Sequence, residues 1–216
     1  MRLEFSDLTD TNLQKWVVSP SGNYYGSEQT LLNYLQLTSL SFEVFVPSNT
    51  SESFLEALNK TKKHRIIRFG STRSLYLKLI FRLLKLRVRN LRVSLYVNEG
   101  GHIRYVNILQ LLFPRLRAII HVRLIEDVYS RPWSRIQSNR IKILSTSAYI
   151  KDALQSLSVS SSLLSSPYRT EQCRFEAIRF DRNNLIVVSR ISKAKGSDFL
   201  CSFLRCCHNL GRTVNL

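Results

Sequence analysis

Short apolar runs alternate with helix-patterned segments along the first 165 residues of the chain. The runs end at Gly, Pro, Ser or charged residues, and they cover residues 16–18, 42–46, 64–69, 93–97, 118–122 and 141–144. Strands that alternate with helices are typical of a parallel sheet covered on both faces. We therefore expect an α/β fold with a Rossmann-like parallel sheet flanked by helices.

The stretch WVVSPSGNYYGSEQTLLNYL, residues 16–35, is the first strand–loop–helix unit. Ser27 is placed to cap the helix, and Glu28 lies in its first turn. A loop that ends at a helix N-terminus offers backbone N–H groups to an anion such as phosphate. The glycines of this loop also fit an ordinary turn, so both interpretations stay open. Ligands of such folds bind at the carboxyl ends of the strands, which here are loops 19–27, 98–102, 121–127 and 145–147.

The chain is strongly basic, with 32 Lys and Arg against 15 Asp and Glu and a net charge of +17. This balance indicates an anionic partner, which nucleic acid, anionic lipid and phosphorylated small molecules all satisfy. The helix expected at 74–89 carries a basic stripe of Lys78, Arg82, Lys85 and Arg89. Two interpretations of this stripe stay open: the solvated face of a sheet-packing helix, or attachment to an anionic membrane surface.

Neither a metal site nor a membrane-spanning segment is indicated by the sequence. Its four cysteines, Cys173, Cys201, Cys206 and Cys207, lack a C-x-x-C pair, so free thiols are expected. The N-terminus has no apolar core of a signal peptide, and no apolar run reaches the length of a spanning helix. We expect a cytoplasmic protein, attached peripherally to the inner face of the membrane if the stripe binds lipid. Trp16 and Trp133 are expected in the core or an interface.

Residues 185–200, LIVVSRISKAKGSDFL, resemble the first strand and helix of the C-terminal domain in retaining GT-B glycosyltransferases of the family 4 type. That segment typically has an apolar strand, Gly or Ser followed by Arg, four residues, and then Lys-Gly. Here it is Ser189-Arg190 followed by Lys195-Gly196. The resemblance implies that Arg190 and Lys195 contact the diphosphate of a nucleotide sugar. Two such cations neutralise the charge that develops as the nucleoside diphosphate leaves.

Other segments extend the resemblance over most of the chain. SGNYYGSEQTLLNYL resembles the first glycine loop of the family, which implies that Gly26 and Ser27 lie near the donor diphosphate. IIHVR places His121 at a strand end where the family often has a histidine that reaches the transferred sugar. ILSTSAYIKDAL and LLSSPYR resemble the segment after the sixth strand and the interdomain segment. Candidate acceptor-side residues are Glu28, His102 and Glu126, although His102 also fits a structural position, and Glu126 and Asp127 also fit solvated loop carboxylates.

The resemblance implies an acceptor-side domain at 1–165, an interdomain segment at 166–183 and the start of a nucleotide-sugar-binding domain at 184–216. The later pair of glutamates that the family carries in its second domain is not in the sequence, so we expect a fragment or a truncated protein. The expected function is transfer of a sugar from a nucleotide sugar to a saccharide or lipid-linked acceptor, in cell-envelope polysaccharide or glycolipid synthesis. It would need no cofactor or metal.

Two alternatives to this function stay open. The first is a truncated, non-catalytic remnant that binds only an acceptor or a membrane. The second is a basic module for nucleic acid, although the sequence has neither zinc-finger spacing nor an RNA-binding strand motif.

Overall fold

The structure is a computed structural model of the 216-residue chain. It describes residues 13–61, 63–88, 91–130, 133, 140–164 and 197–211. The chain divides into two units, Met1–Tyr168 and Arg169–Leu216. The first unit holds a sheet with its helices, and the described part of the second holds the helix α7 (Ser197–Asn209). The strand that the resemblance implies at the start of residues 185–200 lies outside the described residues. The expected division into 1–165, 166–183 and 184–216 stays a prediction.

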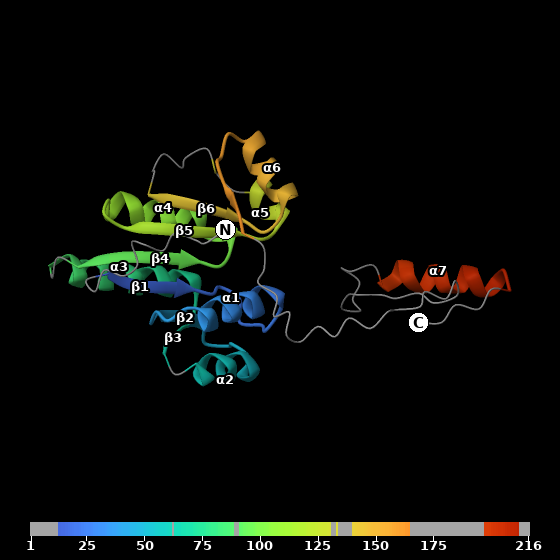
Figure 1. The fold of residues 1–216 in the computed structure, drawn as a ribbon, viewed down its shortest axis with the longest axis horizontal. Helices are drawn as coiled ribbons and strands as arrows, with labels where there is room; N and C mark the ends of the chain where they lie inside the picture. Colours follow the sequence, from blue (N-terminus) through green and yellow to red (C-terminus); the bar gives the residue numbers. More distant parts are fainter. Residues whose placement is uncertain are drawn as a thin grey trace. The chain divides into compact units, whose positions relative to one another are not determined.

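Strands and helices alternate along the first unit, as the apolar runs predict (Figure 1). The strands are β1 (Leu13–Val18), β2 (Glu43–Pro47), β3 (Arg65–Phe69), β4 (Arg92–Val97), β5 (Arg117–Val122), β6 (Ile141–Ser145) and β7 (Ser162–Leu163). The helices are α1 (Gly26–Leu37), α2 (Glu52–Lys60), α3 (Thr72–Val88), α4 (Ile103–Leu112), α5 (Ile125–Ser130) and α6 (Ala148–Ser156), with a 3-10 turn η2 (Gly100–His102) before α4. The sequence pattern did not predict η2, α4 or α5.

All seven strands are parallel, in the order β3-β2-β1-β4-β5-β6-β7. The expected α/β class with a Rossmann-like sheet is therefore confirmed. The chain first adds strands to one side of β1, and then returns through α3 to add β4 on its other side. The pairing of Trp16 with Leu95 places the neighbours β1 and β4 at the topological switch point. In open parallel sheets, ligands bind outside the carboxyl ends of the strands at this point.

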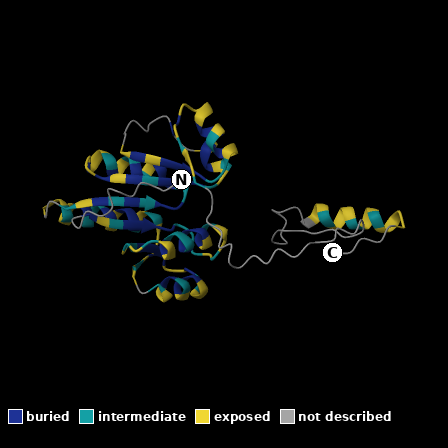
Figure 2. Ribbon diagram, viewed as in Figure 1, coloured by how far each residue is buried: buried dark blue, intermediate teal, exposed yellow. Residues whose placement is uncertain are grey.

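Two apolar clusters cover the two faces of the sheet, and the buried residues follow the strands and the inner sides of the helices (Figure 2). Residues of α1 and α2 pack on one face, with Leu31, Leu32 and Phe54 among them. Helices α3, α4, α5 and α6 contribute to the cluster on the other face. Trp16 and Trp133 are 2% and 1% exposed, so the prediction that they lie in the core is confirmed.

The start of α1 differs from the expectation. Its N-cap is Tyr25 instead of Ser27, and the helix begins at Gly26. The Glu28 side chain reaches back to accept from the Tyr25 backbone N–H at 3.3 Å and from the Ser27 hydroxyl at 2.7 Å. A glutamate at the third helical position satisfies the N-cap N–H in this way, and the helix therefore begins earlier than the serine suggests.

Candidate functional site

Side chains from β4 and β5 meet at the carboxyl end of the sheet, next to the switch point. Tyr96 is the penultimate residue of β4, and Asn98 follows that strand. His121 is the penultimate residue of β5, and Arg123 follows that strand. Successive residues of a strand point to opposite faces, so residues two apart share a face. These four residues therefore lie on the sheet face that α1 covers, and Tyr96 packs against the α1–α2 cluster.

Tyr96 and His121 form the inner pair of this group. The Tyr96 hydroxyl lies 2.6 Å from Nδ1 of His121 and 3.5 Å from Oδ1 of Asn98. We assign the phenolic proton to the much shorter contact, so that Nδ1 accepts and Nε2 carries the ring proton. His121 is fully buried, and Nε2 has no hydrogen-bond partner among the described residues. A buried donor without a partner is costly, which makes it a candidate ligand contact.

Arg123 and Asn98 form the outer pair. Oδ1 of Asn98 accepts from Nε and Nη2 of Arg123 at 3.2 Å and 2.8 Å, which fixes the guanidinium. The amide of Asn98 also donates to the backbone oxygen of Ser27 at 3.4 Å, and its backbone N–H donates to Val18. Asn98 thus joins the end of β4 to the end of β1 and to the first turn of α1. Within the described ranges, no carboxylate pairs with Arg123.

Burial and the arginine together control the protonation of the cluster. Burial, and to a smaller extent the nearby Arg123 charge, lower the pKa of His121 to about 3. Burial raises the pKa of Tyr96 and of Tyr34, while the positive charge of Arg123 opposes both increases. At neutral pH the imidazole and both phenols are therefore neutral, and Arg123 is the one fixed charge of this group. Such a site can donate hydrogen bonds and can attract an anion.

The glycine loop before α1 has features that differ from those expected of a phosphate-binding loop. The positive end of α1 already lies against the Glu28 carboxylate, which is 1% exposed. A Cβ at Gly22 would lie 3.2 Å from the backbone oxygen of Asn49, whereas a Cβ at Gly26 would have no atom within 4 Å. Gly22 therefore permits close packing of two loops. The assignment of Gly26 and Ser27 to the donor diphosphate, and of Glu28 to the acceptor side, stays a prediction.

The other acceptor-side candidates lie apart from the His121 pair. Nδ1 of His102 is 2.9 Å from the hydroxyl of Tyr76 in α3, on the sheet face opposite to α1. Glu126 is exposed in the first turn of α5. Asp127 is 6% exposed, so its interpretation as a solvated loop carboxylate is wrong. It lies in α5 against Gly100, where a Cβ would meet the Asp127 carboxylate at 3.1 Å. Its backbone oxygen accepts from the buried Trp133 indole at 2.9 Å.

The basic stripe of α3 is only partly solvated. Nη1 of Arg82 lies 2.6 Å from a carboxylate oxygen of Glu43, and its guanidinium lies over the Phe45 ring at 5.5 Å. Arg82 thus takes part in the packing between α3 and β2, and its assignment as a membrane contact stays a prediction. Lys78 donates to the Arg68 backbone oxygen at 3.1 Å, and Lys85 is exposed. The fourth member, Arg89, lies outside the described residues.

Arg190 and Lys195, the expected diphosphate contacts, also lie outside the described residues. Three of the four cysteines, Cys201, Cys206 and Cys207, are free thiols, whereas Cys173 lies outside the described part. The described residues include no group of three or more His, Cys, Asp and Glu side chains able to hold a metal ion. None of the described helices combines the length and the apolar character needed to cross a membrane.

The chain matches no protein-family model, no curated protein and no solved structure. A proposal for its function therefore rests on the sequence, the fold and the residues at the switch point. Sequence reasoning identified His121 but missed Tyr96 as its partner and Arg123 as the charged member of the group. Residues two apart share a face of a sheet, so Arg123 is expected on the same face as His121, and Tyr96 on the same face as Asn98. This spacing at the ends of the fourth and fifth strands is the signal that could have found both residues.

Proposed function

We propose that this protein takes part in glycosyl transfer from a nucleotide sugar to a saccharide or lipid-linked acceptor. The observation that supports this function best is the buried, neutral imidazole of His121, which has an Nε2–H without a partner among the described residues. It lies beside the switch point, where parallel sheets bind their ligands. The sequence pattern Ser189-Arg190 to Lys195-Gly196 adds a second, independent reason.

The reaction would break the bond between the anomeric carbon and a phosphate oxygen and form a bond to an acceptor oxygen. The nucleoside diphosphate leaves with the electron pair of the broken bond, and its phosphate oxygen takes the proton that the acceptor hydroxyl loses. His121 would donate a hydrogen bond from Nε2–H to an oxygen of the sugar or phosphate. The hydrogen bond from Tyr96 to Nδ1 fixes the orientation of this neutral donor. Arg123 would attract an anionic group of the ligand. The resemblance implies that Arg190 and Lys195 contact the donor diphosphate.

Access to the imidazole requires a local rearrangement. His121 is fully buried, whereas Arg123 is partly exposed, so the group reaches the surface through the guanidinium. A ligand could reach Nε2 of His121 only after neighbouring groups move apart. Closure around a bound ligand is common in enzymes that exclude water from the reacting centre.

Isothermal titration calorimetry with UDP-, GDP- and ADP-linked sugars tests this function. We expect one of these donors to bind, and Arg190→Ala and Lys195→Ala each to weaken it by about tenfold or more, because each removes a charge-assisted contact to the diphosphate. Lys60→Gln, which removes an exposed charge at the end of α2, is the matched control. No binding by any donor, or unchanged affinity in both variants, would contradict the proposed function.

A further inference from the structure

The outer face of α3 exposes a continuous apolar stripe. Its members Leu77, Phe81, Leu84 and Val88 are 56%, 70%, 46% and 89% exposed. Their spacing of four, three and four residues places them on one side of the helix, over a length of about 16 Å. The opposite side of α3 is also apolar and is buried against the sheet. Only one of the two apolar sides is therefore used by the fold.

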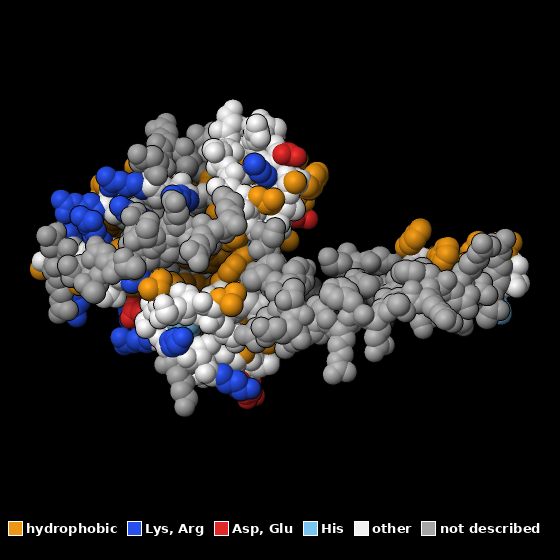
Figure 3. All heavy atoms as spheres, in the orientation of Figure 1, with side chains coloured by type: hydrophobic (Ala, Val, Ile, Leu, Met, Phe, Trp, Pro, Cys, Tyr) orange, Lys and Arg blue, Asp and Glu red, His pale blue; other side chains and the backbone are white. Residues whose placement is uncertain are grey.

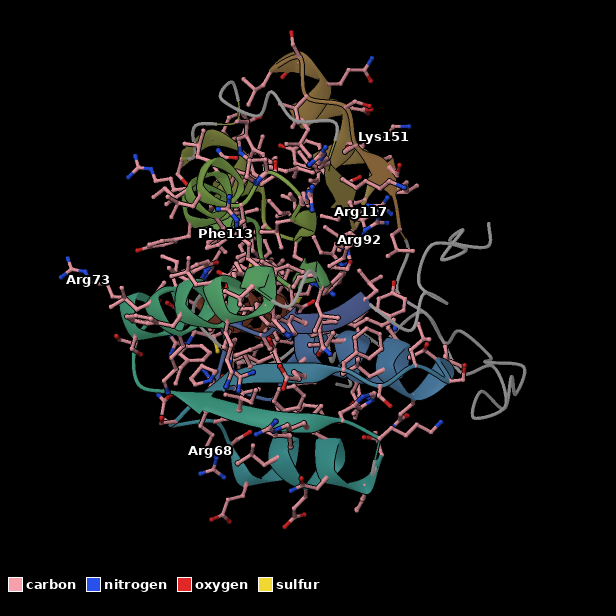
Figure 4. The ribbon with its side chains drawn as sticks, turned by 90° about the vertical axis from the view of Figure 1, so that its left-hand side faces the viewer. Arg68, Arg73, Arg92, Phe113, Arg117 and Lys151 are labelled. Atoms are coloured by element: carbon pink, nitrogen blue, oxygen red, sulfur yellow. The ribbon has the colours of Figure 1, made fainter. Side chains whose placement is uncertain are left out.

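Cations flank this stripe on both sides. At 100° per residue, Lys78 and Lys85 lie along one edge of the stripe, and Arg87 lies along the other. Helix α3 has no acidic residue, and Arg73 projects outward from its first turn (Figure 4). In Figure 3, Lys and Arg side chains gather over the end of the sheet where the strands begin. Exposed Arg92, at the start of β4, belongs to that end.

The neighbouring helix α4 extends the apolar surface. Its Tyr105 ring stacks on Tyr76 of α3 with centroids 4.4 Å apart, which places the two helices side by side. On its outer side α4 exposes Leu111 at 81% and Ile108 and Leu112 at 49% each. Isolated exposed apolar residues are normal, but two adjacent helices with apolar outer sides and a cationic border form an interaction surface.

We propose that this surface, formed by the outer sides of α3 and α4, docks on an anionic lipid bilayer. The apolar side chains enter the boundary between headgroups and acyl chains, and the flanking cations contact the anionic headgroups. A second copy of the chain would bring cations against cations, which opposes self-association through this surface. Nucleic acid would satisfy the cations but would gain nothing from the aliphatic members Leu77, Leu84 and Val88. Of these three partners, only the bilayer uses both components.

Flotation with phosphatidylcholine vesicles, with and without phosphatidylglycerol, tests the proposal on the full chain. We expect binding to the anionic vesicles and much weaker binding to the neutral ones. The double variant Phe81→Ser/Val88→Ser should lower the vesicle-bound to free ratio by about tenfold or more, because two exposed apolar side chains no longer enter the bilayer. Lys85→Gln/Arg87→Gln should lower it as well, and should reduce its dependence on salt.

Matched controls lie on the other face of the sheet. Leu37→Ser changes an apolar residue of α1 that is 70% exposed, and Lys60→Gln changes a cation of α2. Both should bind vesicles like the unaltered chain, and circular dichroism should show all variants folded. Equal binding of the Phe81→Ser/Val88→Ser variant and the unaltered chain would overturn the proposal. Equal binding to neutral and anionic vesicles, or binding of nucleic acid in place of vesicles, would also overturn it.

Discussion

The hydroxyl of Tyr96 lies 2.6 Å from Nδ1 of His121 and joins two neighbouring strands near their carboxyl ends. This contact determines which ring nitrogen of His121 accepts a hydrogen bond and which one carries the proton. With Nδ1 accepting, the proton stays on Nε2, and that nitrogen has no partner in the described part of the chain. Tyr96 is therefore a positioning residue in the proposed function, and His121 is the residue that would touch the ligand.

Replacement of the tyrosine tests this pairing. Tyr96→Phe leaves Nδ1 of His121 buried without a donor, so the free energy of unfolding should fall by about 1–3 kcal/mol. Urea unfolding measures the change. Tyr149→Phe, which alters an exposed tyrosine of α6, is the control and should have no effect. If the two variants are equally stable, the Tyr96–His121 hydrogen bond contributes nothing, and the tautomer assignment loses its support.

Acid sensitivity tests the buried neutral state of His121. Its pKa in the folded chain, about 3, lies below the ordinary value of 6.5, so the unfolded chain takes up a proton first as the pH falls. The contribution of this group to stability is therefore present above about pH 6.5 and is lost toward pH 3, at up to about 1.4 kcal/mol per pH unit. His121→Gln should unfold with a weaker dependence on pH in this window. Parallel curves for the two proteins between about pH 4.5 and pH 7 would contradict the assignment.

Arg123 should control anion affinity more than stability. Arg123→Gln removes the one fixed charge of the His121 group but keeps a hydrogen-bonding side chain next to Asn98. We expect nucleotide-sugar affinity to fall by about tenfold or more, because a charge-assisted contact to phosphate is lost. Calorimetry measures the affinity, and thermal unfolding without ligand serves as the control for folding. An unchanged affinity would place the phosphate elsewhere.

The two glycines of the first loop should respond differently to alanine. A Cβ at position 22 meets the backbone of Asn49 and Thr50 at 3.2 Å and 3.3 Å, so Gly22→Ala should destabilise the fold by about 1–2 kcal/mol. Gly26→Ala meets nothing within 4 Å and should be neutral or slightly stabilising. Urea unfolding of both variants measures this difference. A larger loss for Gly26→Ala would show that the second glycine, and not the first, has the structural role.

The strands of this fold could be predicted because they are short apolar runs with clear ends. The expected runs 93–97 and 118–122 became β4 and β5 with a shift of one residue at the start. A parallel order follows because helix-patterned segments separate the strands. Helix α5 was missed, because six residues with two acids show too little apolar periodicity for a helix to be expected.

Pairings between distant residues could not be predicted from the sequence. Arg82 and Glu43 are 39 residues apart, and only the crossing of α3 over β2 brings them together. The basic stripe that the helical spacing predicts on α3 therefore includes Arg82, a residue that packs against β2. The same holds for the group at the switch point, because the contact between Tyr96 and His121 depends on the register of β4 against β5. Local patterns place each residue on a face but do not fix that register.

The most direct test of the central claim is nuclear magnetic resonance of histidine labelled with ¹⁵N, with His121→Gln used to assign the signal. At neutral pH the His121 ring should be neutral, with the proton on Nε2 and an unprotonated Nδ1. Addition of the nucleotide sugar that binds should shift the Nε2–H resonance, because that proton gains an acceptor. A charged ring, a proton on Nδ1, or an Nε2–H resonance that no nucleotide sugar changes would contradict the proposed role of His121.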